Sequence, residues 1–231
     1  MNRSAGRAIR VLLLSIVLWP LRTDAQEINS PYRFIETRQS AMVFGGYLST
    51  GRGTLQLGPE STPFYGARYD LIVSGPFALE AEIGRFASTR MVWDTVAGDT
   101  TREAIGEADF GAVTALAALR FNLTGARTYH RLLPYLLFGL GAVVETSGES
   151  AIEEDLSSDL KLDYGTSFAG MLGGGIEWLT DGGFGVRLDA RNILWKLKTP
   201  RAFLLREEGA TLPSDEWSQN FSFTAGLVFH F

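Results

Sequence analysis

The sequence predicts an all-β protein, an eight-stranded antiparallel up-and-down β-barrel that spans a membrane. Three observations lead to this fold class. Eight stretches are strand candidates, and seven of them alternate large apolar residues with polar or small ones at the two-residue period of a strand. Long and short connections alternate between these stretches, as in a meander that closes into a barrel. The last stretch, Asn220 to Phe231, has one almost wholly apolar face and ends on an aromatic residue.

Residues 1–25 have the pattern of a cleaved signal peptide. Three arginines precede a short apolar run, Val11 to Trp19, and Thr23-Asp24-Ala25 has small residues in its first and third places. An N-terminal anchor helix is the alternative, but this run is shorter than the about 20 residues that a membrane span needs. The predicted division is a signal peptide at 1–25, a polar periplasmic lead-in at 26–39 and a barrel domain at 40–231.

The composition argues against several classes of function. The chain has no cysteine, so it has no disulfide, no thiolate metal site and no cysteine nucleophile. Its formal net charge is −5, and removal of the signal peptide, with four arginines and one aspartate, makes it −8. A nucleic-acid partner is therefore not expected, because its phosphates need basic side chains for neutralisation.

The first half of the barrel is predicted to contain four strands. The first alternates poorly, because the pair Gly45-Gly46 does not show which face is which. The other three place large apolar residues opposite charged or small ones, as at Leu79 and Glu80. A tight turn at Gly75-Pro76 joins the second strand to the third. The four strands are 40–48, 64–74, 77–87 and 110–122, with long polar loops at 49–63 and 88–109.

The second half is predicted to contain four more strands. Leu136 and Phe138 share a face opposite Gly139 and Gly141 in the fifth strand, and Thr180-Asp181-Gly182-Gly183 is a hairpin turn signal between the sixth and seventh. The strands are 135–146, 165–179, 184–197 and 220–231, with a moderate connection at 123–133 and long polar loops at 147–164 and 198–218. This order places both ends of the barrel domain on the side of the short connections.

The charged residues of the polar faces decide which face points inward. They carry both signs, and they are Arg68, Asp70, Glu80, Glu82, Arg120, Glu145, Glu177, Arg187, Asp189 and Arg191. Small residues among them suit the narrow interior of an eight-stranded barrel, and the large aromatic face suits lipid. We expect Tyr135, Trp178, Phe184 and Trp195 near strand ends, in the aromatic girdles of a membrane barrel. An exported soluble lipocalin-like binding protein, with its apolar face inward, is the alternative.

Inward charges of both signs predict a lumen that is closed by salt bridges. Opposite charges on neighbouring strands pair, and an unpaired charge in a narrow lumen is costly. We expect Arg187, Asp189 and Arg191 to reach Glu177, and Arg120 to reach Glu80 or Glu82. Because acidic residues outnumber basic ones, the alternative is a small cation-leaning pore for solutes.

The sequence offers no arrangement of catalytic residues. Glu80 and Glu82 share a face, as a catalytic pair would, but the arginines on the same side favour a structural role. His130 and His230 have no serine and acid partners that the sequence can argue for. The acidic loop 147–164 does not have the spacing of an EF-hand. We therefore predict no enzymatic activity, no metal and no cofactor.

The chain resembles the small outer-membrane β-barrel proteins of Gram-negative bacteria, the OmpA/OmpX-type, porin-like group. The resemblance rests on the signal peptide, the stretch Pro134 to Gly141 (PYLLFGLG) and the terminal strand that ends at Phe231. It implies an outer-membrane location, with membrane lipid and lipopolysaccharide around what we expect to be a monomer. It also implies that the barrel-assembly machinery recognises the terminal strand through Phe223, Leu227, Phe229 and Phe231.

Overall fold

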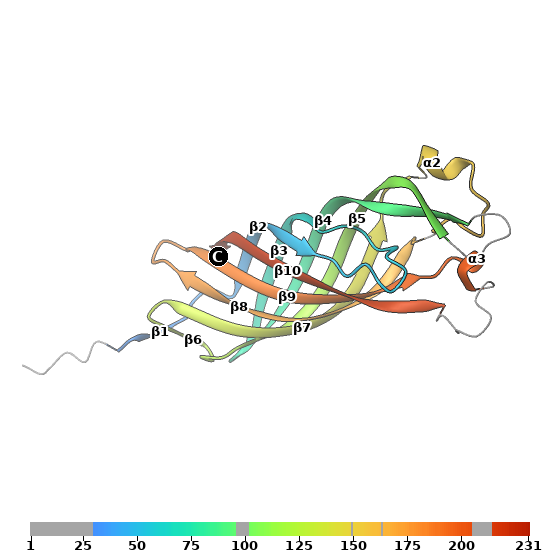
Figure 1. The fold of residues 1–231 in the computed structure, drawn as a ribbon. Coiled ribbons are helices and arrows are strands. Elements are labelled where there is room, and N and C mark those ends of the chain that lie inside the picture. The colour runs from blue at the N-terminus through green and yellow to red at the C-terminus, as the bar shows by residue number, and fades with distance from the viewer. Residues whose placement is uncertain (1–29, 96–101, 149, 163, 205–213) are drawn as a thin grey trace, which may run out of the picture. The chain divides into compact units, whose positions relative to one another are not determined.

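The computed structural model describes residues 30–95, 102–148, 150–162, 164–204 and 214–231. The predicted signal peptide, 1–25, lies outside these residues, as do parts of the lead-in and of three predicted loops. Pro31–Phe231 forms one compact unit, which Figure 1 shows as a barrel of tilted strands.

Eight strands form a closed antiparallel ring, with each strand paired to the next along the chain and the last, β10, paired to the first, β2. This confirms the predicted eight-stranded up-and-down barrel. The seam between β10 and β2 runs in register from Phe221 opposite Ser49 to His230 opposite Ser40. The ring strands are β2 Gln39–Ser49, β3 Thr62–Ser74, β4 Phe77–Thr95, β5 Arg102–Asn122, β7 Leu132–Glu145, β8 Thr166–Leu179, β9 Phe184–Lys198 and β10 Asp215–His230.

The two ends of the barrel differ. The short β3–β4 and β8–β9 turns, the β5–β7 connection and the C-terminus lie at one end, which we call the turn end. Two one-turn helices, α2 (Ala151–Glu154) and α3 (Arg201–Leu204), lie in the long connections at the other, the loop end (Figure 1). Within the described part of the chain, no helix is long and apolar enough to cross a membrane.

The predicted loop 88–109 was wrong in extent, because β4 and β5 continue through most of it. Their pairing runs from Phe77 opposite Phe121 to Thr95 opposite Arg102. The inner side of this extension buries Val92 and Ala108, so the strand period persists beneath a polar composition. In the same way, β10 begins at Asp215, inside the predicted loop 198–218.

The segment Pro31–Arg38, predicted as an irregular lead-in, crosses the turn end, and we call it the strap. Its short strand β1 (Tyr32–Phe34) pairs with β6 (Arg127–Tyr129), which lies between β5 and β7. In the ring order these strands lie opposite β2, into which the strap continues. Backbone hydrogen bonds fix both ends of the strap, from His130 N to Pro31 O at 2.9 Å and from Ile72 N to Arg38 O at 2.8 Å.

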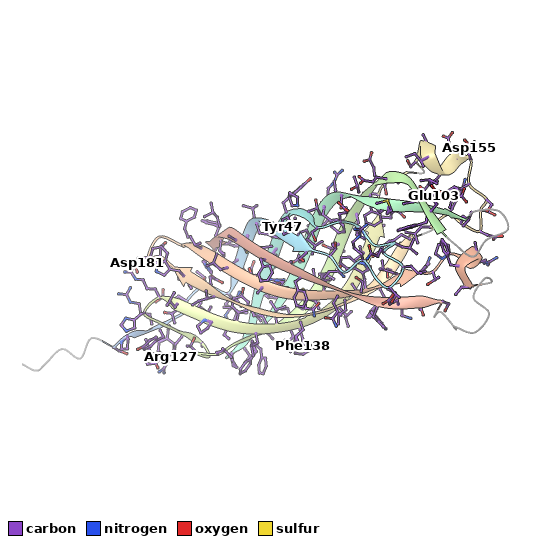
Figure 2. All side chains as sticks on the ribbon, in the orientation of Figure 1. Tyr47, Glu103, Arg127, Phe138, Asp155 and Asp181 are labelled. Atoms are coloured by element: carbon purple, nitrogen blue, oxygen red, sulfur yellow. The ribbon has the colours of Figure 1, made fainter. Side chains whose placement is uncertain are left out.

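The two faces of the ring are chemically opposite. Large apolar side chains from every ring strand lie exposed on the outside, such as Phe138 at 59% and Leu227 at 64%. Figure 2 shows Phe138 projecting away from the barrel wall. The inside holds buried charges towards the turn end and buried aromatic rings towards the loop end.

Candidate functional site

The candidate site is the lumen of the barrel, where charged side chains from several strands meet. Alternation along each strand turns every second side chain inward. The charges come in pairs or triplets from β3, β4 and β9 and singly from β5 and β8. Glu145 apart, the charged residues predicted to line the lumen are all buried. We call them the lumen network: Arg68, Asp70, Glu80, Glu82, Arg120, Glu177, Arg187, Asp189 and Arg191.

Arg187 lies at the centre of the lumen network, and its side chain is 0% exposed. Its Nη1 donates to Asp70 Oδ2 at 2.9 Å, and its Nη2 donates to Glu80. Its Nε donates to the Tyr135 hydroxyl at 2.6 Å. The Tyr135 hydroxyl in turn donates to Asp189. Arg187 therefore holds carboxylates from β3 and β4 and a phenol from β7 at once.

Arg68 and Arg191 share two carboxylates. Arg68 donates to Glu82 at 2.6 Å and to Asp189 at 2.7 Å. Arg191 donates to the same two residues, at 2.8 and 2.9 Å, and to Glu80 Oε1 at 2.6 Å. Buried charges that are paired and hydrogen-bonded in this way avoid most of the penalty of an isolated buried ion.

The sequence predicts that Arg120 reaches Glu80 or Glu82, but the structure gives it other partners. It donates to Glu177 Oε2 at 2.9 Å and lies 3.6 Å from Asp70. Glu177 lies opposite Arg187 in the register of β8 and β9, but its carboxylate pairs with Arg120 and lies 2.7 Å from His230 Nε2. The prediction used neighbouring strands, whereas these ion pairs reach across the lumen.

Glu145 lies apart from the lumen network, at the loop end of β7. Its carboxylate accepts hydrogen bonds from Ser147 Oγ at 2.9 Å and from Gly165 N at 3.3 Å. The strand period predicts its inward face, but Glu145 is the last residue of β7 and lies nearer the loop end than the lumen network.

Tyr135 and Trp195 point into the barrel, so their predicted place in the aromatic girdles was wrong. They are 1% and 0% exposed, whereas Trp178 and Phe184 do lie on the outer face, at 48% and 60%. The signal was in the sequence: Tyr135 alternates with outward Leu136, and Trp195 has the parity of inward Arg187. Tyr135 therefore hydrogen-bonds to the lumen network, although its aromatic side chain near a strand end predicts a lipid-facing position.

No protein-family model and no curated protein matches the chain. Among solved structures, the crystal structure of Neisserial surface protein A (NspA) matches with a TM-score of 0.53 and 10% identity, over 84% of this chain and 97% of that chain. The outer membrane protein OprG from Pseudomonas aeruginosa matches with a TM-score of 0.53 and 12% identity, over 84% and 97%.

The chain has the fold of the small outer-membrane β-barrels. At these identities the likeness concerns the fold, and both matched structures are covered almost over their whole length. What fills the lumen of this barrel is therefore argued from its own residues.

Towards the loop end, an aromatic layer fills the lumen of the outer-membrane-type barrel. Phe86 stacks on Trp195 with ring centroids 6.1 Å apart, and it also contacts Phe64 and Phe110. Tyr164, from the β7–β8 connection, packs edge-on against Phe110 at 5.2 Å. The lumen is thus occupied by charges in one half and by aromatic rings in the other.

Inward glycines make room for these large side chains. A Cβ on Gly84 would lie 2.5 Å from Phe64 Cζ, and one on Gly175 would lie 2.7 Å from Tyr135 Cζ. Real Cβ atoms do not approach so closely, so both neighbours occupy space that only glycine leaves open. The small residues of the polar face therefore accommodate specific rings in a narrow barrel.

At the loop end, apart from the lumen network, Arg90 and Glu153 form a further buried ion pair, at 2.6 Å, that joins β4 to α2. Sequence reasoning missed it, because both residues fell in predicted polar loops. Among the described residues no group of three or more histidine, cysteine or acidic side chains is arranged to hold a metal ion.

The residues predicted to form the assembly signal lie on the outer face of the outer-membrane-type barrel. Phe223, Leu227, Phe229 and Phe231 are between 47% and 64% exposed. Phe231 follows β10 and donates its backbone N–H to Gln39 O at 3.0 Å, at the seam. An apolar face that points outward is the reverse of the lipocalin-like arrangement, in which it would line a ligand cavity.

Proposed function

We propose that this protein is an integral outer-membrane barrel with a closed lumen and a structural or surface role. The observation that carries the proposal is the inside-out distribution of polarity. Apolar residues cover the outside of the ring, while paired charges with fully buried side chains occupy its inside. Exposure of this apolar outer face to water would be unfavourable, and soluble monomers rarely expose large contiguous apolar patches.

Lipid is the solvent that fits the outer face. A spanning strand in a closed barrel satisfies its backbone within the sheet and turns alternate side chains to lipid. Aromatic residues such as Trp178, Phe184 and Trp217 suit the two membrane interfaces. In this proposal the turn end faces the periplasm and the loop end faces the exterior, next to lipopolysaccharide.

Export and assembly complete the proposal. Residues 1–25 would be removed as a signal peptide, and the strap and barrel would follow as the mature monomer. The outward Phe223, Leu227, Phe229 and Phe231 would be recognised by the barrel-assembly machinery, since they remain accessible on the last strand. A role that involves nucleic acid is not proposed.

The lumen contents favour a closed barrel over a small pore. Every ring strand contributes a side chain to the lumen network or a hydrogen bond to it, including Thr224 of β10, which accepts from Arg68 at 3.1 Å, and Ser40 of β2, which donates to Asp70 at 3.3 Å. Between the lumen network and the strap, a cavity of about 20 Å³ has room for one water molecule. A cation would have to displace several ion pairs to pass.

Cell fractionation followed by gel electrophoresis tests the membrane part of the proposal. We expect the mature protein in the outer-membrane fraction, extracted only by detergent, with a gel mobility that changes after boiling because the folded barrel resists the detergent. Recovery as a buffer-soluble protein without such a change would support the lipocalin-like alternative instead.

A further inference from the structure

A pocket of about 500 Å³ opens at the turn end, between the strap and the β8–β9 turn. Its charged lining has both signs: Arg33 and Glu36 from the strap, Arg131 from the β6–β7 turn, and Asp181 from the β8–β9 turn. These four side chains sum to zero charge. His230 also borders the pocket, but it lies 2.7 Å from the network residue Glu177.

The two guanidinium groups converge on one carboxylate. Arg33 Nη1 lies 2.7 Å from Asp181 Oδ1, and Arg131 Nη2 lies 2.5 Å from Asp181 Oδ2. The side chains remain accessible, at 60% for Arg33 and 38% for Arg131. A guanidinium has five N–H donors, and Asp181 takes one nitrogen of each, so both groups can bind a further oxyanion.

An unusual backbone presents Arg131 to the pocket. His130 and Arg131 have φ angles of +49° and +67°, so two successive residues other than glycine lie in the left-handed region. A two-residue hairpin turn of this kind favours Asn-Gly. Leu179 N holds the conformation by donating to Arg131 O at 2.9 Å. Strained backbone of this kind persists where the surroundings enforce it and is frequent at binding sites.

The pocket adjoins the lipid-facing wall of the barrel. Leu132 follows Arg131 directly and is exposed on the outer face, opposite Trp178 on β8. A ligand held by Arg131 can therefore extend apolar chains along Leu132 and Trp178 without leaving the protein surface.

We propose that this pocket binds the headgroup of a zwitterionic aminophospholipid of the inner leaflet. The phosphate lies between Arg33 and Arg131, the ammonium group meets Glu36 and Asp181, and the acyl chains follow the outer wall. A purely anionic headgroup would meet the two carboxylates, and a purely cationic ligand would meet the two guanidiniums. This inference rests on the proposed membrane location.

Native mass spectrometry of the folded mature chain in non-ionic detergent tests the proposal. The probes are phosphatidylethanolamine, phosphatidylcholine and phosphatidylglycerol with identical acyl chains. We expect phosphatidylethanolamine to bind about tenfold more tightly than phosphatidylcholine, whose methylated ammonium has no N–H to donate to a carboxylate. Equal binding of these two lipids would overturn the proposal.

Substitutions separate the site from general charge effects. The double variant R33Q/R131Q should bind phosphatidylethanolamine about tenfold more weakly than the parent, whereas the affinity of R127Q should stay within about twofold of the parent. Arg127 is the control, since it is an exposed arginine of the same end that does not itself line the pocket, although it stacks over the lining residue Phe34. Equal losses in both variants would mean that net charge, and not this pocket, attracts lipid.

The acidic side of the pocket gives a prediction of opposite sign. E36Q/D181N should bind phosphatidylglycerol more tightly, because two repelling carboxylates are removed, and should lose the preference for phosphatidylethanolamine over phosphatidylcholine. A structural clasp alone would not produce this gain. If it is absent, the assignment of the ammonium group is wrong.

Two controls keep this inference apart from the proposed function. Soluble glycerophosphoethanolamine should not compete at the lipid's concentration; if it does, the site recognises a soluble amine phosphate and the lipid assignment falls. All variants should keep the mobility change on boiling. A protein that shows this change but no lipid preference contradicts only the headgroup site, whereas loss of the change in the parent contradicts the proposed function.

Discussion

The side chain of Arg187 is fully buried, and the carboxylates around it offset the cost of burying its charge. Taking an ion out of water is costly, and the paired Asp70 and Glu80 offset that cost only while Arg187 is present. Removal of the guanidinium leaves Asp70 paired with Arg120, at 3.6 Å, and Glu80 paired with Arg191, so both buried carboxylates lose a partner.

We expect Arg187→Met to lower the free energy of unfolding by about 3–5 kcal/mol, because buried carboxylates lose an ion-pair partner. Urea unfolding of the refolded protein in detergent or lipid vesicles measures this. Arg52→Met is the control, since Arg52 pairs with Glu60 at 3.3 Å at a partly exposed site, where an ion pair contributes about 1 kcal/mol or less. Similar losses in both variants would contradict a special role for the lumen network.

Tyr135 tests the hydrogen bonds of the network without a change of charge. Tyr135→Phe removes a hydroxyl that accepts from Arg187 and donates to Asp189. We expect a loss of about 1–3 kcal/mol in the same unfolding experiment, because buried partners lose a hydrogen bond. Tyr69→Phe removes a hydroxyl that bonds Gln39 on the exposed outer face, and it should change stability by less than about 1 kcal/mol.

At the scale of residues, parity along a strand could be predicted from the sequence and partners could not. The inward direction of Glu80 and Arg187 follows from alternation alone. The pairing of Arg120 with Glu177 depends on which side chains meet across the lumen, and this is set by strand tilt and stagger. Tyr135 and Trp195 were misplaced because residue type was given more weight than parity.

At the scale of elements, β3 and β4 fit together because a glycine on one lies beneath an aromatic ring on the other. Gly84 of β4 faces Phe64 of β3, and the added Cβ would lie 2.5 Å from Phe64 Cζ. The interior there has no spare volume for a methyl group.

We expect Gly84→Ala to destabilise the barrel by about 1–3 kcal/mol through overpacking. Gly170→Ala is the control, because a Cβ at Gly170 meets nothing within 4 Å and alanine there should be neutral or slightly stabilising. Thermal unfolding of the two variants in the same detergent compares them directly. Tolerance of alanine at Gly84 would mean that the aromatic layer is loosely packed.

The terminal strand β10 gives a prediction about assembly. Deletion of Phe231 should reduce the amount of folded barrel in outer membranes several-fold while leaving refolding of the purified chain in detergent intact. The residue lies beyond the strand, and its ring lies near the rings of Tyr69 and Phe229 on the outer face. Phe221→Ala, on the same face but ten residues earlier in the chain, is the control. Equal losses from both changes would remove the special role of the last residue.

The extent of β4 and β5 and the presence of β1 show what the sequence concealed at this scale. The β4–β5 hairpin continues beyond residue 88 with charged residues, whose polar composition predicts a loop although the two-residue period continues. The pairing of Tyr32–Phe34 with Arg127–Tyr129 spans too few residues for any periodic signal. Closure of the ring was predictable, because an open sheet of eight strands would leave two strand edges with unpaired backbone groups.

At the scale of the whole molecule, the barrel is occupied along its axis. The aromatic layer fills the loop-end half, the lumen network fills the turn-end half, and the strap crosses the turn end. Polarity is inverted relative to a soluble barrel, with apolar side chains outside and paired charges inside. The sequence predicted this inversion from its charged faces, but the strap and the aromatic layer became visible only in three dimensions.

Single-channel recording in planar lipid bilayers tests the central claim, that this membrane barrel is closed. The protein is added in its folded form. Insertion is verified by recovering the protein with the bilayer lipid and showing that its gel mobility changes on boiling. We expect no discrete conductance steps, since ions would have to pass both the aromatic layer and the lumen network. Reproducible steps with cation selectivity would contradict the closed lumen and establish the pore instead.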